Sequence, residues 1–156
     1  LLEYTILSYI FPLFFVILTP MKLTTTNFIR CGLTGWCLEV FWTGLGSLLS
    51  ADRKMTGTTS LLMFPIYGMA ALLQPVYQVI KNRNMLFRGG VYTFFIFTAE
   101  YLSGSLLRLF HMCPWDYSGS RFAIQGLIRL DYAPAWFVTG LLMEQIVRGN
   151  SLLKKS

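Results

Sequence analysis

Several ionisable side chains of this sequence lie inside runs of apolar residues, where a charge is costly and therefore informative. Glu39 stands in the middle of the stretch GWCLEVFW, and Glu100, Arg108 and Glu144 lie in later apolar runs. A charged side chain at the centre of a lipid bilayer costs about 2.5–3.5 kcal/mol on insertion scales, so it calls for compensation. The pattern has two interpretations: a polar cavity that handles a proton, an ion or a lipid headgroup, or a structural network that fixes the register of packed helices.

Helical periodicity gathers the acid of the run 28–49 with small residues on one face. At about 100° per residue, five positions fall within about 80° of one another: Gly32, Gly35, Glu39, Thr43 and Gly46. Small residues on one stripe let a neighbouring helix approach closely, so we expect Glu39 to point into a helix bundle. The run 89–110 has a second face of similar width, formed by Thr93, Glu100, Gly104, Arg108 and His111.

The basic residues near these acids suggest how the charges would be compensated. Roughly 12 Å of helix axis separates Glu100 from Arg108, so we expect no tight pair between them. Arg108 would instead answer a carboxylate on another helix, with Glu39 and Glu144 as candidates. Within its own helix, Glu144 can also pair with Arg148 at the next turn, in the favourable order of acid before base.

The stretch CPWDYS, residues 113–118, is the most specific in the sequence. Pro114 ends a helix, while Trp115 and Tyr117 are residue types that suit a membrane–water interface. Asp116 can cap a turn or accept a hydrogen bond from a nearby arginine. The stretch is therefore either a loop anchored at the level of the lipid headgroups or a contact for a ligand.

His111 and Asp116 have the His-x-x-x-x-Asp spacing of glycerolipid acyltransferases, in which the imidazole acts as a base and the carboxylate orients it. Two fixed positions match by chance often, and no glycine-rich substrate motif follows, so we favour a protein that is not an enzyme and assign no catalytic residue. One histidine and three scattered cysteines form no metal-binding pattern. GxSxG and phosphate-loop motifs are absent, and we predict neither a metal nor a cofactor.

The composition places the chain in a membrane. Hydrophobic residues make up 54% of the 156 residues and charged residues only 13%, whereas soluble domains carry about 25% charged residues. The mean hydropathy is +0.55. The net charge is +6, but the basic residues flank apolar runs and form no block of five or more. This pattern indicates topology signals and contacts with phospholipids, and it argues against binding of nucleic acid.

Charges and turn signals divide the sequence into five apolar spans within one transmembrane domain, residues 1–156. A helix needs about 20 mostly apolar residues to cross a membrane. The first span lacks the features of a cleaved signal peptide, and we expect a retained helix. Pro65 and Pro75 interrupt the third span, where Pro65-Ile66-Tyr67-Gly68 predicts a kink. The predicted spans are 4–21, 28–49, 55–80, 89–110 and 132–147, and residues 111–131 form an ordered interfacial or re-entrant loop.

The distribution of Lys and Arg predicts the orientation. With five spans, the face that carries the C-terminus collects more basic residues than the face that carries the 111–131 loop. The positive-inside rule then places the C-terminus in the cytoplasm and this loop on the far side of the membrane.

Four motifs occur in the same order as in a known family. They are Gly35-Trp36-Cys37-Leu38-Glu39, Pro65-Ile66-Tyr67-Gly68, Glu100-Tyr101-Leu102-Ser103-Gly104 and Trp115-Asp116-Tyr117-Ser118. Over residues 28 to 148 the sequence is similar to a bacterial group labelled as CmpB-type ABC-transporter permeases, in which these motifs follow in this order. CPWDYS, followed by FAIQGLIRLDYAPAWFVTGLLMEQ, resembles the vertebrate transmembrane protein 229 family. The resemblance implies a core of four membrane helices and no settled activity, and the first span, 4–21, would be an addition to this core.

Together these observations predict an all-α membrane bundle with a polar intramembrane site that binds or passes a small solute, an ion or a lipid. Its predicted binding residues are Glu39, Tyr67, Glu100, Arg108, Trp115, Asp116 and Tyr117. The alternatives are a lipid-modifying enzyme that uses His111 and Asp116, and a scaffold or accessory subunit of a membrane complex. Membrane lipids are the expected partners, and assembly as a homo-oligomer or within a larger membrane complex stays open.

Overall fold

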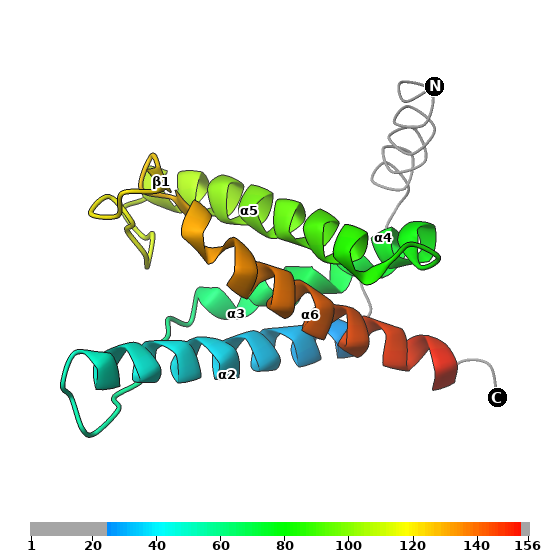
Figure 1. The fold of residues 1–156 in the computed structure, drawn as a ribbon, viewed down its shortest axis with the longest axis horizontal. Helices are drawn as coiled ribbons and strands as arrows, with labels where there is room; N and C mark the ends of the chain where they lie inside the picture. The colour runs from blue at the N-terminus through cyan, green and yellow to red at the C-terminus, as the bar shows by residue number, and fades with distance from the viewer. Residues whose placement is uncertain (1–24, 154–156) are drawn as a thin grey trace.

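The computed structural model describes residues 25–153, with side chains described as far as Arg148, and the chain is mostly helical. The predicted span 4–21 lies outside the described residues. The order of elements is α2 (Thr25–Leu49), a broken helix, α5 (Met85–Leu109), a short hairpin and α6 (Ala133–Leu153). Figure 1 shows these helices as one bundle, with α6 running between α5 and α2.

The third predicted span begins later than the sequence suggested, because residues 55–62 are not helical. They run back along α2, where the Thr43 and Ser47 hydroxyls donate hydrogen bonds to the backbone carbonyls of Thr58 and Thr56. The helix that follows is broken into α3 (Met63–Gly68), the 3₁₀ turn η1 (Met69–Leu72) and α4 (Leu73–Ile80).

The break in this helix agrees with the predicted kink and lies directly after Gly68. Pro75 accounts for the position of the break. A proline ring clashes with the carbonyl group four residues earlier, which here belongs to Ala71 in η1.

Residues 111–131 contain no α-helix, as predicted, but they do contain a hairpin that the sequence analysis missed. Strands β1 (Ala123–Ile124) and β2 (Ile128–Arg129) pair antiparallel, and the 3₁₀ turn η2 (Leu130–Tyr132) leads into α6. Gly126 in the turn has a φ of +67°, and a Cβ atom there would lie 2.4 Å from Ser118 Oγ. Glycine is therefore required for the turn to fold onto the CPWDYS stretch.

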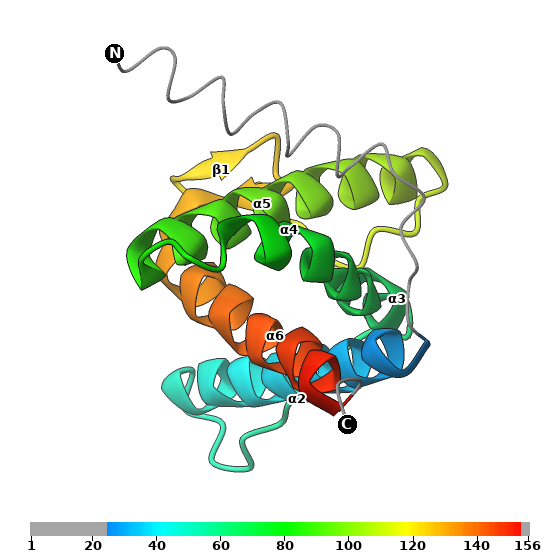
Figure 2. The same ribbon diagram turned by 90° about the vertical axis from the view of Figure 1, so that its right-hand side faces the viewer.

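The bundle consists of two closely packed helix pairs joined by α6. Helix α2 packs on α3, α5 packs on α6, and α6 also touches α4 and α2. Figure 2 shows α6 crossing the bundle diagonally from α5 toward α2. The buried apolar core is formed by Cys31, Ala71, Leu73, Val76, Ile80, Tyr92, Met143 and Val147.

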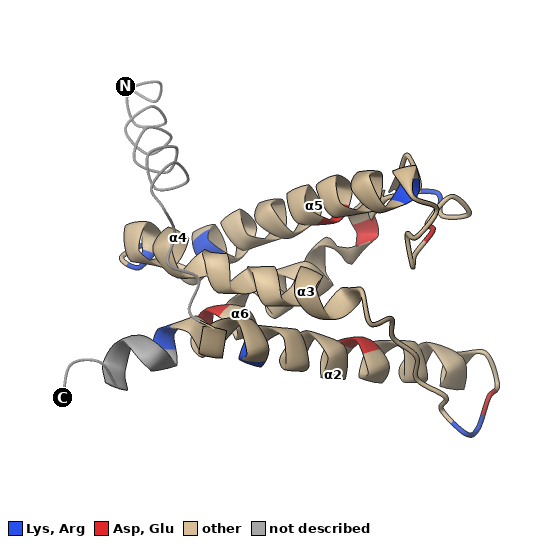
Figure 3. Cartoon of the chain, turned by 180° about the vertical axis from the view of Figure 1, so that it is seen from behind, with Lys and Arg blue, Asp and Glu red and all other residues tan. Residues whose placement is uncertain are grey.

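The outer faces of the helices are apolar. Phe41 on α2 and Phe94, Leu102 and Leu109 on α5 are more than half exposed, and the helix walls in Figure 3 carry few charged residues compared with the helix ends and loops. By length and composition, one helical segment of the described chain could cross a membrane, Met63–Ile80. Helices α2 and α5 are each 25 residues long but more polar, so four crossings stay a prediction.

Candidate functional site

Glu100 is the buried acid of α5, as the periodicity of the sequence predicted. Its residue surface is 9% exposed. The indole Nε1 of Trp136, on α6, donates a hydrogen bond of 3.1 Å to Glu100 Oε2, and the Tyr117 side chain also interacts with this carboxyl group. No salt bridge within residues 25–148 includes Glu100. Neutral hydrogen-bond donors therefore hold a buried acid that would usually require a cation.

Glu39 of α2 is half-buried and lies in the same part of the bundle. The Thr59 hydroxyl donates a hydrogen bond of 2.7 Å to Glu39 Oε2. Tyr67 and Tyr117 each lie within electrostatic range of both Glu39 and Glu100. The two acids therefore flank the same pair of tyrosines although they belong to helices far apart in the sequence.

A glycine allows Tyr67 to reach this position. Helix α3 packs on α2 so closely that a Cβ atom on Gly35 would lie 2.0 Å from Tyr67 Cγ. Gly35 is one turn before Glu39 on the predicted small-residue stripe. The stripe thus lets the ring of Tyr67 lie next to the acid, as expected for close packing of helices on small residues.

Further aromatic rings extend the site toward α6. The ring centroids of Tyr132 lie 5.7 Å from Tyr117, 6.2 Å from Trp136 and 5.7 Å from Trp42, all in edge-to-face arrangements. We call the group that surrounds the two acids the acidic–aromatic site: Glu39, Tyr67, Glu100, Tyr117, Tyr132 and Trp136. Its four rings are all partly exposed.

Sequence reasoning missed Tyr132 and Trp136, although a signal was present. Gly140 and Glu144 stand four residues apart, one turn of the last helix, and so share a face. The same spacing of four residues, continued backward along that face, reaches Trp136 and then Tyr132.

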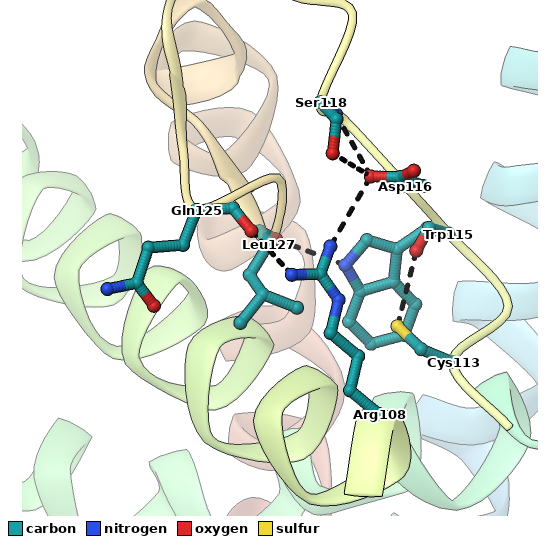
Figure 4. A network of polar contacts seen from close by, with 7 residues as sticks. All are labelled: Arg108, Cys113, Trp115, Asp116, Ser118, Gln125 and Leu127. Carbon is teal, nitrogen blue, oxygen red and sulfur yellow. Dashed lines mark hydrogen bonds and ion pairs between the residues drawn. The ribbon is translucent and has the colours of Figure 1, made fainter. Parts of the chain in front are cut away.

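Arg108, Trp115 and Asp116 belong to a different network, shown in Figure 4. Arg108 Nη2 lies 3.3 Å from Asp116 Oδ1, and Arg108 Nη1 donates to the backbone carbonyl of Gln125. Trp115 Nε1 donates to the Leu127 carbonyl at 3.0 Å. The expectation that Arg108 pairs with Glu39 or Glu144 is therefore wrong, because the loop that follows α5 folds back over the end of its own helix.

This network fastens the 111–131 loop to the end of α5. Hydrogen bonds from the Ser118 hydroxyl and backbone N–H, together with the nearby Arg108 guanidinium, hold the pKa of Asp116 below its ordinary value. The ion pair is solvent-exposed, with side-chain exposures of 37% for Arg108 and 67% for Asp116. Exposed pairs contribute little to stability, so the network orders the loop more than it stabilises the bundle.

His111 lies at the end of α5 with a φ of +54°. It lines an open cavity of about 370 Å³ together with Arg108, Cys113, Trp115, Asp116 and Ser118. In the described structure, Asp116 Oδ1 accepts from Ser118 and Arg108 rather than from His111. The base-and-orienter arrangement that the acyltransferase spacing would require is therefore not formed.

Glu144 is fully buried and has a different partner from the predicted ones. Arg88 of α5 donates to both of its oxygens, with Nε 2.9 Å from Oε2 and Nη2 3.2 Å from Oε1. The Tyr92 hydroxyl donates to Oε2 at 2.7 Å. The predicted pairing of Glu144 with Arg148 is wrong, because Glu144 faces α5 inside the bundle and Arg148 is exposed.

Within residues 25–153, no group of three or more His, Cys, Asp or Glu side chains is arranged to hold a metal ion. Cys31, Cys37 and Cys113 are free thiols. What the described side chains offer is therefore a pair of carboxyl groups among aromatic rings, and separately an arginine–aspartate network at the loop.

A comparison with protein families shows which family the chain belongs to. The model of a family described as "Putative ABC-transporter type IV", the CmpB type, matches residues 26–153. The match covers the whole helical bundle, and the chain belongs to this family. No solved structure matches the chain. The family supports a transport-related function in a membrane. Each of the four ordered motifs contributes one residue to the acidic–aromatic site: Glu39, Tyr67, Glu100 and Tyr117.

Proposed function

We propose that this chain is a multi-pass membrane protein, and not an enzyme, whose acidic–aromatic site binds or passes a small solute, an ion or a lipid. One observation carries the proposal. Glu39 and Glu100 come from separate helices to the same two tyrosines, and neither forms a salt bridge within the described residues. Carboxyl groups without basic partners inside a bilayer are costly, which favours a guest that compensates them.

The arrangement of loops supports several crossings. Figure 1 places the loops 50–62 and 110–132 at one end of the bundle, and the turn 81–84 and the end of α6 at the other. We infer that residues 1–156 form one transmembrane domain, that its C-terminus is cytoplasmic, and that lipids cover the exposed apolar faces. Kinship with the vertebrate transmembrane protein 229 family, which rests on CPWDYS and the FAIQGLIRLDYAPAWFVTGLLMEQ stretch that follows it, is part of this proposal.

The test is ligand-dependent stability of the purified full chain. The melting temperature in detergent would be measured against a panel of inorganic ions, amines, amino acids and lipids, because a ligand that binds only the folded protein raises its stability. We expect at least one class to raise the melting temperature of the wild type and to have no effect on Glu39→Gln or Glu100→Gln.

Asp116→Asn is the matched control, because it removes an acid outside the acidic–aromatic site. It should keep the response to the ligand. A panel to which the wild type does not respond, or a response that survives in both glutamine variants, would contradict the proposal and favour a scaffold whose polar groups only fix helix packing.

The enzyme alternative is tested by His111→Ala. We expect this variant to bind and, after reconstitution, to transport like the wild type, because the described structure gives the imidazole no role in holding Asp116. Loss of a lipid-modifying activity in this variant alone would instead establish the enzyme.

A further inference from the structure

We propose that the acidic–aromatic site takes an organic cation, an amine or a quaternary ammonium group. This inference rests on the proposed function and names the class of its ligand. The argument combines the charge of the site, the nature of its lining and the contrast with the buried acid of α6.

The charge of the site favours a cation. Among the described side chains, the hydrogen-bond donors to these acids are neutral: Thr59 for Glu39, and Trp136 and Tyr117 for Glu100. The two arginines on the helix of Glu100 have other acids as partners: Arg88 pairs with Glu144 and Arg108 with Asp116. An anion would be repelled by these carboxyl groups, whereas a positively charged guest would offset part of their charge.

The lining favours an organic cation over a metal ion. Calcium takes about six to eight oxygen ligands, and magnesium requires a near-octahedral set of ligands. This site offers two carboxyl groups. Tyr67, Tyr117, Tyr132 and Trp136 instead present aromatic rings that are partly exposed. Aromatic faces attract ammonium and guanidinium groups through the quadrupole of the ring.

The aromatic cluster already holds one cation on its outer side. The Arg129 guanidinium carbon lies 4.4 Å from the centroid of the Tyr132 ring, and its Nη1 donates to the Tyr132 hydroxyl. Arg129 is itself paired with an acid, because Asp131 accepts a hydrogen bond from it at 2.8 Å. The inner acids have no such resident cation among the described side chains, although the same cluster adjoins them.

The experiment is calorimetric titration of the purified full chain in nanodiscs of phosphatidylglycerol, which carries no amine. The probes are choline, tetramethylammonium and the neutral isostere of choline in which carbon replaces the ammonium nitrogen. We expect both cations to bind and the isostere to bind at least about tenfold more weakly. Glu100→Gln should weaken choline binding about tenfold or more.

Ring variants give a second readout that is independent of the acids. Trp136→Leu should weaken choline binding several-fold, while the matched control Phe94→Leu, an exposed ring on the outer face of α5, should leave it unchanged. Circular dichroism spectra would establish that each variant is folded. Equal binding of choline and its neutral isostere, or unchanged binding in folded Glu100→Gln, would overturn the inference.

The lipid composition of the nanodiscs distinguishes two sources of the cation, a lipid headgroup and a free amine. If the natural occupant is a lipid headgroup, nanodiscs that contain phosphatidylcholine should compete with choline, and if it is a free amine they should not; either result supports the inference. A site that responds to sodium or protons but not to choline or tetramethylammonium would overturn it and leave the proposed function intact.

Discussion

Glu144 and Glu100 are both buried carboxyl groups inside helices of the same bundle, but their surroundings differ. Glu144 is fully buried and receives three hydrogen bonds, two of them from Arg88 and one from Tyr92. Glu100 is 9% exposed and is held by neutral aromatic donors beside a second acid. Among the side chains that the structure describes, Glu144 has a cationic partner and Glu100 has none.

This difference separates the two interpretations that the sequence left open. A buried acid with a two-point arginine contact satisfies its own charge and fixes the packing of two helices, which is a structural role. An acid whose neighbours are neutral and partly exposed has no cation to offset its charge, and a positively charged ligand can supply one. Under the proposed function, Glu144 has a structural role and Glu100 a binding role. The presence or absence of a cationic partner distinguishes the two.

The largest effect should come from removing the cation that pairs with Glu144. Arg88→Leu leaves Glu144 buried without its partner, and we expect the free energy of unfolding to fall by about 3–5 kcal/mol. Denaturation of the purified protein in detergent measures this. The double variant Arg88→Leu with Glu144→Leu should recover much of the loss, and a double variant as unstable as the single one would show that the pair has no special role.

A smaller loss should follow from closing the approach of Tyr67 to the acids. Gly35→Ala places a methyl group against the base of the Tyr67 ring, and we expect a cost of about 1–3 kcal/mol together with weaker ligand binding. Gly46→Ala is the matched control on the same helix, because a Cβ atom there meets nothing within 4 Å. Unfolding curves of the two variants that coincide would show that Gly35 is not a close-packing position.

Removing the charge of Glu100 should change stability least among the buried sites. Glu100→Gln keeps an acceptor for Trp136, and we expect a change within about 1 kcal/mol, in either direction, because no buried cation loses its partner. The comparison with Arg88→Leu in the same unfolding assay is decisive. A loss from Glu100→Gln as large as that from Arg88→Leu would mean that Glu100 is structural as well.

The smallest effect concerns the exposed pair at the loop. The pKa of Asp116 is held below its ordinary value of 3.8, first by Ser118 and also by Arg108. The ionised Asp116 carboxylate therefore stabilises the loop at pH values above its ordinary pKa. This stabilisation is lost as the pH falls through the lower pKa of the folded state. Protection of the amides in residues 113–127 against exchange, after correction for the pH dependence of the intrinsic rate, should fall at acid pH, while Asp116→Asn should show reduced protection already at neutral pH. Protection in the wild type that does not change with pH would contradict this assignment.

Much of the bundle could be predicted from residue patterns alone. Small residues beside Glu39 and Glu100 placed both acids on inward faces, and helices were found near the four predicted core spans. The hairpin at Ala123–Arg129 was missed because two-residue strands are too short to show an alternating pattern. Residues 55–62, MTGTTSLL, were assigned to a helix because they carry no charge. The absence of charge does not show whether the backbone hydrogen bonds of a segment are formed within it or with a neighbour.

The sequence by itself determined that Gly32, Gly35, Glu100 and Gly104 turn inward, because helical periodicity is a local property of the chain. Only the tertiary structure decided which base answers which acid, because Arg88 and Glu144 stand 56 residues apart and meet through the packing of α5 on α6. The same packing brings Trp136 to Glu100, whereas the folding of the loop after α5 brings Asp116 to Arg108. Which of the buried acids has a cation as its partner is therefore decided by how the helices and loops pack.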